Sequence, residues 1–288
     1  LGLLGVFGGF FIVPLFALVQ QRAPREQLSR VIAANNILNA LFIVIAAGLA
    51  IVLLGPVGLS IPELFLVTAA LNAVVAIYIF SLVPEFLMRF LVWLLTLAMY
   101  RIDVRGVEEN IPDEGPALVV CNHVGYMDAL LLGGAIPRPV KFVMYYKIFR
   151  IPVMNWVFRA GGAIPIAGSK EEPEIFREAF ERIDAALANG EIVGIFPEGG
   201  LTKDGEIATF RPGVEKILAR RPVPVVPMAL KNLWGSLFSR RDSRLGRMRL
   251  PRRFRAAIGI EATTPVPGDI ATAALLEDRV RALRGDAA

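Results

Sequence analysis

The first 84 residues contain three long runs without a charged side chain, and these runs limit the possible folds more than any other feature. They cover residues 1–21, 31–62 and 64–84. A helix needs about 20 apolar residues to cross the hydrocarbon core of a bilayer, and each run is long enough. A signal peptide does not fit, because three runs follow one another and no basic region precedes the first. The sequence therefore predicts three transmembrane helices over residues 1–84.

Basic residues in the connecting loops predict how these helices are oriented. The loop between the first two runs carries Arg22, Arg25 and Arg30. The next loop, residues 55–61, carries no Lys or Arg. Because short cytoplasmic loops are enriched in basic residues, the first loop is assigned to the cytoplasm, and the third helix then ends there. We expect a multi-pass protein of the inner (plasma) membrane with its C-terminal domain on the cytoplasmic side.

Residues 85–115 are predicted to form an interfacial helix and a linker. The apolar stretch Phe86–Tyr100 reaches only about 22 Å at roughly 1.5 Å per residue, which is short of a bilayer core of roughly 30 Å. It contains Arg89 and Trp93, residue types that favour the membrane–water interface. The polar segment 103–115 is typical of a linker. The alternative is that the third membrane helix continues through this stretch.

The remaining segment, residues 116–288, alternates between short apolar runs and amphipathic helices. This pattern is typical of an α/β domain with a mixed sheet flanked by helices. Strands are predicted at residues 117–121, 141–144, 163–166, 192–196, 223–230 and 254–261. Helices are predicted at residues 126–136, 153–160, 171–189, 214–220 and 271–283. Most of the strands are apolar on both sides, as expected for a sheet that is covered on two faces.

Composition excludes several classes of function. The chain has one His and one Cys, which excludes a disulfide scaffold and a zinc site built from these residues. The net charge of +5 is modest, and no nucleic-acid-binding motif accompanies it, so nucleic acid is not expected as a partner. A basic stretch at Lys231–Arg255 is predicted to contact anionic membrane lipids, an acidic carrier protein or the phosphate groups of a small-molecule carrier. A solvated loop is the alternative.

The only histidine, His123, follows an apolar strand and precedes Asp128 by five residues. On a regular helix these side chains would lie roughly 140° apart and could not meet. They can meet if His123 lies in the turn and Asp128 in the first helical turn, and Gly125 makes that bend easy. A carboxylate on one imidazole nitrogen leaves the other free to take a proton. The pair is interpreted as a general base acting on a hydroxyl, and a structural histidine that caps the next helix is the alternative.

A second polar segment follows another apolar strand. It consists of Phe196, Pro197, Glu198, Gly199 and Gly200. Ligands gather at the strand ends of such sheets, and adjacent glycines let backbone N–H groups approach an anion. Taken alone, the segment is equally consistent with a plain turn.

Together, Asn-His-x-x-x-x-Asp at residues 122–128 and Phe-Pro-Glu-Gly at residues 196–199 resemble the glycerolipid acyltransferase family. Three further blocks are similar to that family, at residues 162–166, 210–213 and 223–227. The run Met228–Phe238 is similar to a branch in which the acyltransferase is fused behind a major facilitator superfamily transporter of lysophospholipids. Residues 1–84 would then be the C-terminal end of a truncated transporter domain.

The resemblance implies an enzyme that moves a fatty acyl chain from acyl-coenzyme A (acyl-CoA) or acyl carrier protein to the free hydroxyl of a lysophospholipid or lysophosphatidate. It assigns His123 as the base and Asp128 as its orienting partner, and it implies no metal or organic cofactor. The residues that it implies for acceptor binding are Asn122, Phe196, Pro197, Glu198, Gly199, Gly200, Lys203 and Arg211.

Two positions depart from the family pattern and keep other functions open. The second block often ends in Arg, where this chain has Gly168, and the third often has Arg soon after Glu-Gly, where this chain has Gly200 and Leu201. The hypothesised substitutes for phosphate binding are Lys170, Lys203 and Arg211.

One alternative function is that of a lysophospholipid transporter fragment with an inactive, lipid-binding domain. A thioesterase or lipase is the other, although the chain lacks a Gly-x-Ser-x-Gly elbow.

Overall fold

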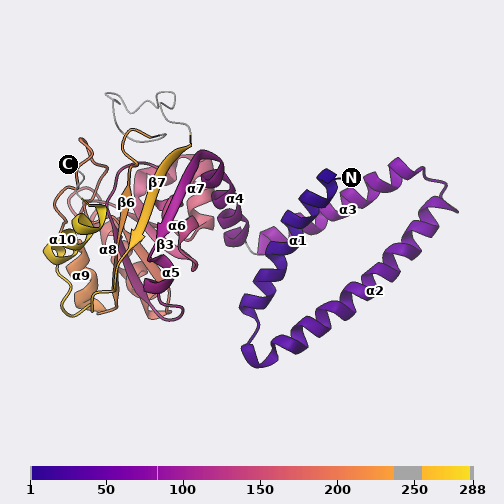
Figure 1. Cartoon of the computed structure of the whole chain (residues 1–288), viewed down its shortest axis with the longest axis horizontal. Coiled ribbons are helices and arrows are strands. Elements are labelled where there is room, and N and C mark those ends of the chain that lie inside the picture. Colours follow the sequence, from indigo (N-terminus) through magenta and orange to yellow (C-terminus); the bar gives the residue numbers. More distant parts are fainter. Residues whose placement is uncertain (1, 83, 237–254, 286–288) are drawn as a thin grey trace. The chain divides into compact units, whose positions relative to one another are not determined.

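The computed structural model describes residues 2–82, 84–236 and 255–285, and the chain divides into two compact units, residues 1–78 and 79–288. The first unit is helical (Figure 1). Its elements are α1 (Gly2–Arg22), the 3-10 turn η1 (Arg25–Gln27), α2 (Leu28–Leu54) and α3 (Ile61–Leu82), which continues into the second unit. No described residue of α2 is buried, although the helix is apolar almost throughout. A helix of this kind requires lipid or other protein around it.

The prediction of three transmembrane helices is wrong for the described residues. Two helical segments are long and apolar enough to cross a membrane, Leu28–Leu54 and Ile61–Ile79. The apolar part found in α1 is Gly5–Ala17. At about 1.5 Å per residue it extends only roughly 20 Å, less than the hydrocarbon core of a bilayer. Two long apolar helices, rather than three, therefore precede the second unit.

The second unit is an α/β domain built on a seven-stranded sheet. Its strands are β1 (Tyr100–Arg105), β2 (Ala117–Cys121), β3 (Val140–Tyr145), β4 (Ile164–Ile166), β5 (Ile192–Ile195), β6 (Val225–Lys231) and β7 (Ala256–Ala262). The strand order is β1-β7-β6-β2-β5-β3-β4, and every neighbouring pair is parallel except β6 with β7. The prediction of a mixed sheet flanked by helices is confirmed.

Helices cover both faces of this sheet (Figure 1). One face carries α8 (Pro173–Ala188), α9 (Gly213–Arg220) and α10 (Ala273–Arg284), and the other carries α4 (Pro84–Met99), α5 (Val107–Asn110), α6 (Asp128–Ala135) and α7 (Pro152–Ala160). A further 3-10 turn, η2 (Tyr146–Arg150), follows β3. Successive β2 residues point to opposite faces, so Leu118 and Val120 join the core under α8 to α10, whereas Val119 and Cys121 join the core that contains α6.

Strand β1 lies within the segment that the sequence assigned to the interfacial helix and linker. It is an edge strand that pairs only with β7, and four of its six residues carry polar or charged side chains. Tyr100, expected in the interfacial helix, is instead fully buried in the core as the first residue of β1. An edge strand with one exposed side has no long apolar run, which is why its composition resembles a linker.

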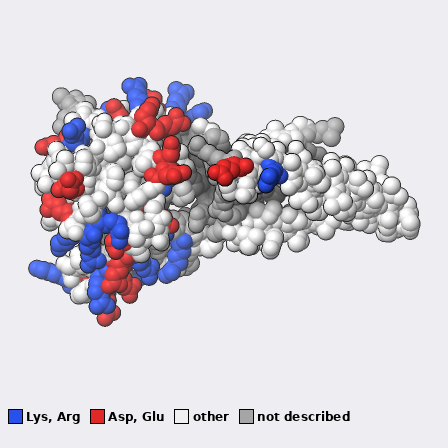
Figure 2. Space-filling view, turned by 90° about the horizontal axis from the view of Figure 1, so that it is seen from below, with Lys and Arg blue, Asp and Glu red and all other residues white. Residues whose placement is uncertain are grey.

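The remaining predicted elements correspond to observed ones with small shifts at their ends. The six predicted strands are β2 to β7, and the five predicted helices are α6 to α10. Most of the basic stretch at 231–255 lies outside the described residues. In the face shown in Figure 2, Lys, Arg, Asp and Glu are spread over the α/β domain, whereas the apolar helices show almost no charge. The interfacial position expected for α4 stays a prediction.

Candidate active site

The carboxyl ends of β2 and β5 bring the two polar segments together. These strands are parallel neighbours, with Val120 opposite Ile195, so the loops that follow them emerge side by side at one edge of the sheet. His123 lies in the turn after β2, and Asp128 is the first residue of α6. The Nδ1 atom of His123 lies 2.8 Å from Oδ2 of Asp128. The turn thus places the two side chains in contact across their five-residue spacing.

The Asp128 carboxylate is held on several sides inside the protein. It is fully buried, and its oxygens accept hydrogen bonds from the N–H groups of Val124 (2.6 Å) and Gly125 (2.9 and 3.0 Å). A carboxylate only accepts, so Nδ1 of His123 is the donor in this pair and Nε2 is free to take a proton. The His123 side chain is 23% exposed. The geometry therefore suits a histidine that takes a proton from a molecule at the surface.

The loop after β5 holds the backbone of His123 from both sides. The Glu198 carboxylate accepts from the His123 N–H at 2.7 Å, and the Thr202 N–H donates to the His123 carbonyl at 2.9 Å. The other Glu198 oxygen accepts from the Ala208 N–H at 2.8 Å. Both carboxylate oxygens of Glu198 therefore have backbone partners, and only 5% of the residue is exposed.

Burial raises the pKa of the Glu198 carboxyl above its ordinary value, because the charged form loses water. The N–H bonds from Ala208 and His123 favour the charged form and oppose that shift. The charge of His123 acts in the same direction as these bonds, and the negative charge of Asp128 adds to the rise. The protonation of Glu198 is thus tied to the hydrogen bonds that fix His123.

Asn122 connects the end of β2 to β6. Its side-chain oxygen accepts from the Leu230 N–H at 2.8 Å, and its amide nitrogen donates to the Leu230 carbonyl at 3.1 Å. The residue is 1% exposed. The polar side-chain atoms of Asn122 are thus bonded within the sheet, and the residue supports the His123 turn by connecting it to β6.

Aromatic rings form a row beside the histidine. The rings of His123 and Phe196 are stacked, with centroids 4.2 Å apart and an interplanar angle of 15°. Phe142 of β3 continues the row, 6.1 Å from Phe196 at 14°. Stacking fixes the plane of the imidazole, and its contact with Asp128 fixes the rotation within that plane.

Gly199 and Arg211 fit together next to this row. Gly199 has a φ of +71°, and a Cβ at this position would lie 2.7 Å from the guanidinium carbon of Arg211. The backbone N–H of Arg211 also donates to the Pro197 carbonyl at 2.9 Å. Glycine is therefore required here both by the backbone and by the side chain that lies over it. Lys203 and Gly200 are exposed, and a Cβ added at Gly200 would meet nothing within 4 Å.

An apolar cavity of about 280 Å³ lies between β3 and the helices of one face. Val92 of α4, Leu130 and Gly133 of α6, and Phe158 of α7 contribute to its wall. Phe142 also lines it, so one aromatic side chain belongs both to the cavity and to the row that ends at His123. Most of the remaining lining lies at the amino ends of β3 to β5, where Arg138, Lys141 and Glu191 also contribute, so only Ala129 and Phe142 bring the cavity near the side of the histidine.

The sequence analysis did not identify the contacts of α10 and Phe142 with this part of the site. Glu277 and Arg281 of α10 have the spacing of a helical ion pair, which can be recognised in the sequence. Their bonds to Phe210 and Ile207, in the loop after β5, cannot be recognised there. Within the described residues, no three His, Cys, Asp or Glu side chains gather in a way that could hold a metal ion.

Comparison with known proteins matches the same region. A family model described as Acyltransferase matches residues 101–231. A chloroplastic 1-acyl-sn-glycerol-3-phosphate acyltransferase of Brassica napus is 31% identical over 131 residues, which are 46% of this chain and 37% of that protein. A protein of the same name from Borreliella burgdorferi is 28% identical over 138 residues, 48% of this chain and 54% of that protein. The chain thus spans about half or less of these relatives.

The crystal structure of the 1-acyl-sn-glycerophosphate acyltransferase of Thermotoga maritima has a similar fold. It aligns with a TM-score of 0.52 and 22% identity, over 86% of this chain and 95% of that chain. The family model matches residues 101–231, which form most of the α/β domain, and the solved structure shows that this domain has the fold of an acyltransferase of that name. The expected fusion to a major facilitator transporter finds no support in these comparisons.

Proposed function

We propose that this chain transfers a fatty acyl group from a thioester carrier, acyl-CoA or acyl carrier protein, to the free hydroxyl of a lysophospholipid, with lysophosphatidate as the acceptor that its relatives suggest. The observation that carries the proposal is the 2.8 Å contact between His123 and the buried Asp128, at the edge where two parallel strands end. The names of the relatives support the substrate class.

The reaction that this geometry supports is direct transfer by a general base. Nε2 of His123 takes the proton of the acceptor hydroxyl while its oxygen attacks the thioester carbonyl carbon. The tetrahedral intermediate then collapses, the C–S bond breaks, and the leaving thiolate takes the proton from the imidazolium. Asp128 holds Nδ1–H and stabilises the transient imidazolium, and general base catalysis of this kind contributes roughly 10²–10⁴ in rate. The products are an ester and a free thiol.

The apolar cavity suits the acyl chain. Its wall is built mainly from aliphatic and aromatic side chains, and Phe142 links it to the row that ends at His123. Burying a methylene group gains about 0.8 kcal/mol, so a chain that fills the cavity binds mainly by loss of apolar surface from water. The proposal requires the thioester carbonyl to lie at the end of the cavity nearest Ala129 and Phe142, on the side of His123.

Arg211 is the favoured group for the acceptor phosphate. All three candidates, Arg211, Lys203 and Lys170, are exposed, but the Arg211 guanidinium lies over Gly199, in the loop that holds His123. A guanidinium can bind phosphate oxygens in a bidentate manner, which an ammonium cannot. If Arg211 has this role, Arg211→Gln raises the KM for the acceptor and leaves that for the thioester unchanged. Lys203→Gln is the matched comparison, and unchanged acceptor affinity in both variants would contradict the assignment.

We place the enzyme in the inner (plasma) membrane, with its α/β domain in the cytoplasm. Two apolar helices long enough to span a bilayer support the membrane part of this proposal. The basic loop with Arg22, Arg25 and Arg30 supports the orientation.

The test is acyl transfer by the full chain in phospholipid nanodiscs. A labelled acyl thioester is offered on coenzyme A or on acyl carrier protein, with a panel of lysophospholipids that differ in headgroup. The wild type should form a product with at least one acceptor, and His123→Ala should abolish it. Release of free fatty acid without acceptor dependence would favour a thioesterase. A folded wild type that forms no product with any pair would favour an inactive, lipid-binding domain.

A further inference from the structure

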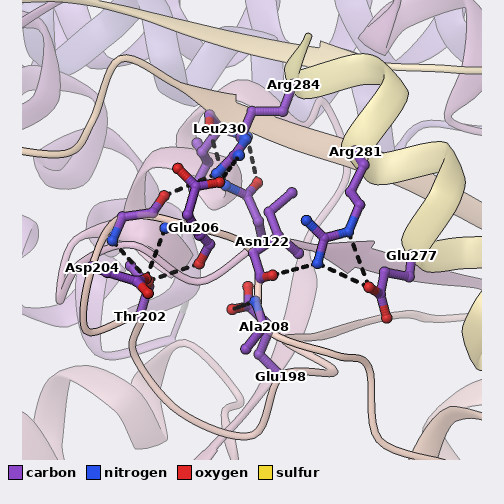
Figure 3. A network of polar contacts seen from close by, with 12 residues as sticks. Asn122, Glu198, Thr202, Asp204, Glu206, Ala208, Leu230, Glu277, Arg281 and Arg284 are labelled. Atoms are coloured by element: carbon purple, nitrogen blue, oxygen red, sulfur yellow. Dashed lines mark hydrogen bonds and ion pairs between the residues drawn. The ribbon is translucent and has the colours of Figure 1, made fainter. Parts of the chain in front are cut away.

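Helix α10 lies against the loop that supports His123. This loop, residues 202–210, connects the β5 end to α9, and Figure 3 shows it between Glu198 on one side and α10 on the other. The helix is outside residues 101–231, which the family model matches. Its contacts with the loop are therefore a feature of this chain that the family match does not describe.

One face of α10 supplies all three side chains that hold the loop. Glu277, Arg281 and Arg284 are spaced so that they share one side of a helix. The Glu277 carboxylate accepts from the Phe210 N–H at 2.9 Å and from Arg281 Nε at 3.0 Å. The Arg284 guanidinium donates to the Gly205 carbonyl at 2.9 Å and to the Glu206 carboxylate at 2.6 Å.

Arg281 and Glu198 bind the two ends of the same peptide group. The Arg281 guanidinium donates to the carbonyl of Ile207, and the N–H of that peptide, which belongs to Ala208, donates to Glu198 at 2.8 Å. The other Glu198 oxygen accepts from the His123 N–H at 2.7 Å. A continuous series of charge-assisted hydrogen bonds thus leads from α10 to the histidine. Figure 3 shows the part of this series between α10 and Glu198.

The two arginines differ in the partners that they bind and not in burial. The side chains of Arg281 and Arg284 are 31% and 15% exposed, but Arg284 binds Glu206, which is 69% exposed, whereas Arg281 binds Glu277, which is 16% exposed. Hydrogen bonds in a medium of low dielectric constant are stronger than in water, and bonds in series polarise one another. Arg284 acts on the exposed part of the loop, and Arg281 acts on the peptide that Glu198 uses.

We propose that Arg281 is a positioning residue for His123, acting through the Ile207–Ala208 peptide and Glu198. The proposal rests on the proposed function, since it takes His123 to be the general base. Arg281 withdraws electron density from the peptide carbonyl, which makes the Ala208 N–H a better donor to Glu198. Glu198 then holds the His123 backbone in the place where its ring meets both Phe196 and Asp128.

Loss of Arg281 should therefore change the proton affinity of Glu198. The N–H bond from Ala208 opposes the rise that burial causes in the Glu198 pKa. A weaker bond lets that pKa rise further, and protonated Glu198 offers an O–H where the two N–H groups need an acceptor. The other charges that act on Glu198 are His123, which lowers its pKa, and Asp128, which raises it. Both remain in the variant, so the direction of the change is set by Arg281.

The test compares Arg281→Gln, Arg281→Lys and Arg284→Gln in the full chain, in nanodiscs. Arg279→Gln is the control, because Arg279 is an exposed residue of the same helix. Displacement of a catalytic group by about 1 Å can cost as much as 100-fold, so Arg281→Gln should lower kcat by about 10- to 100-fold with the thioester KM unchanged. The acid limb of its kcat–pH profile should move to higher pH. Arg281→Lys should recover part of the rate, and Arg279→Gln should behave as wild type.

A purely structural role for Arg281 would give a different pattern. It would make Arg281→Gln and Arg284→Gln equivalent, since both arginines anchor the same loop. A double-mutant cycle adds a second criterion, because the effect of Arg281→Gln should vanish in a Glu198→Gln background if Arg281 acts through that carboxylate. Equal effects of the two arginines, an unmoved pH profile or additive effects with Glu198→Gln would each overturn the proposal.

Hydrogen exchange separates failure of this inference from failure of the proposed function. In Arg281→Gln, the amides of Ala208 and His123 should exchange faster, while those of β6 keep the wild-type rate. This measurement needs no activity, so it decides the matter even if the wild type transfers no acyl group. It also reports whether the variant is folded. Unchanged exchange at His123 would overturn the role of Arg281 whether or not the protein is an acyltransferase.

Discussion

The two faces of the sheet differ in what lies beneath their helices. On the face of α8, α9 and α10 the core is one cluster of buried apolar side chains, and charged side chains of α10 bind the loop that holds His123. On the face of α4, α6 and α7 the helices leave an apolar cavity of about 280 Å³. The faces meet at the edge where β2 and β5 end. Under the proposed function, the helix α10 on one face supports the His123 turn, and the cavity on the other face binds the acyl chain.

The largest effect is expected for a substitution of Asp128, which lies where β2 and β5 end. In Asp128→Asn the side chain keeps its size but presents an N–H in place of one acceptor, opposite the N–H groups of Val124 and Gly125. We expect kcat to fall by roughly 10²–10⁴, the usual contribution of a general base. Asp113→Asn, at an exposed position of the segment before β2, is the control. A rate close to wild type in Asp128→Asn would remove the dyad from the mechanism.

Substitutions of two adjacent glycines in α6 test the face with the cavity. Gly133 lines the cavity, and a Cβ there would lie 3.6 Å from Phe142, whereas Gly134 faces Thr96 and Val92 at 3.8 Å. Gly133→Leu should shift the preferred thioester to shorter chains, with about a 10-fold loss for long ones, as expected from two methylenes that no longer fit. Gly134→Ala should keep the wild-type preference. An identical chain-length profile in both variants would mean that the acyl chain lies elsewhere.

A smaller effect, on the pH dependence of stability, is expected at Glu198, where the contacts from α10 reach the His123 backbone. Because burial raises the Glu198 pKa, its ionised form is disfavoured in the fold, and the free energy of unfolding should fall as pH rises through the raised value. Glu198→Gln has no such dependence, so its stability relative to wild type should increase with pH over this range. Denaturant unfolding between pH 4 and 8 measures the difference. A constant difference across that range would show that Glu198 has an ordinary pKa.

The smallest effect is expected at the start of α10. The Thr272 hydroxyl accepts from the Leu275 N–H at 3.2 Å and caps the helix. Thr272→Ala should cost about 1 kcal/mol of local stability, seen as faster hydrogen exchange in α10. Thr264→Ala, at an exposed position just after β7, is the control. If the α10 amides exchange at the same rate in both variants, the Thr272 cap does not stabilise α10.

Much of the α/β domain could be predicted because most of its strands and helices have a recognisable pattern within a short stretch of sequence. Strands covered on both faces, such as β2 and β5, are short apolar runs, and α8 has a clear helical period. The edge strand β1 was missed, because one of its sides is exposed and its sequence alternates in charge. The number of membrane-length helices was overestimated, since an uncharged run in α1 was taken for a sufficiently long apolar one.

The sequence by itself identified the two polar segments, at residues 122–128 and 196–200, and placed both of them at strand ends. His123 is the only histidine, and its spacing to Asp128 allowed the two side chains to meet only if a turn was followed by a helix. Only the tertiary structure decided that Glu198 turns toward the His123 backbone and that α10 completes the loop. Contacts between residues 123, 198, 207 and 281 arise when strands distant in sequence pair and a C-terminal helix packs on them. No local pattern encodes such pairings, because their free energy comes from the assembled sheet.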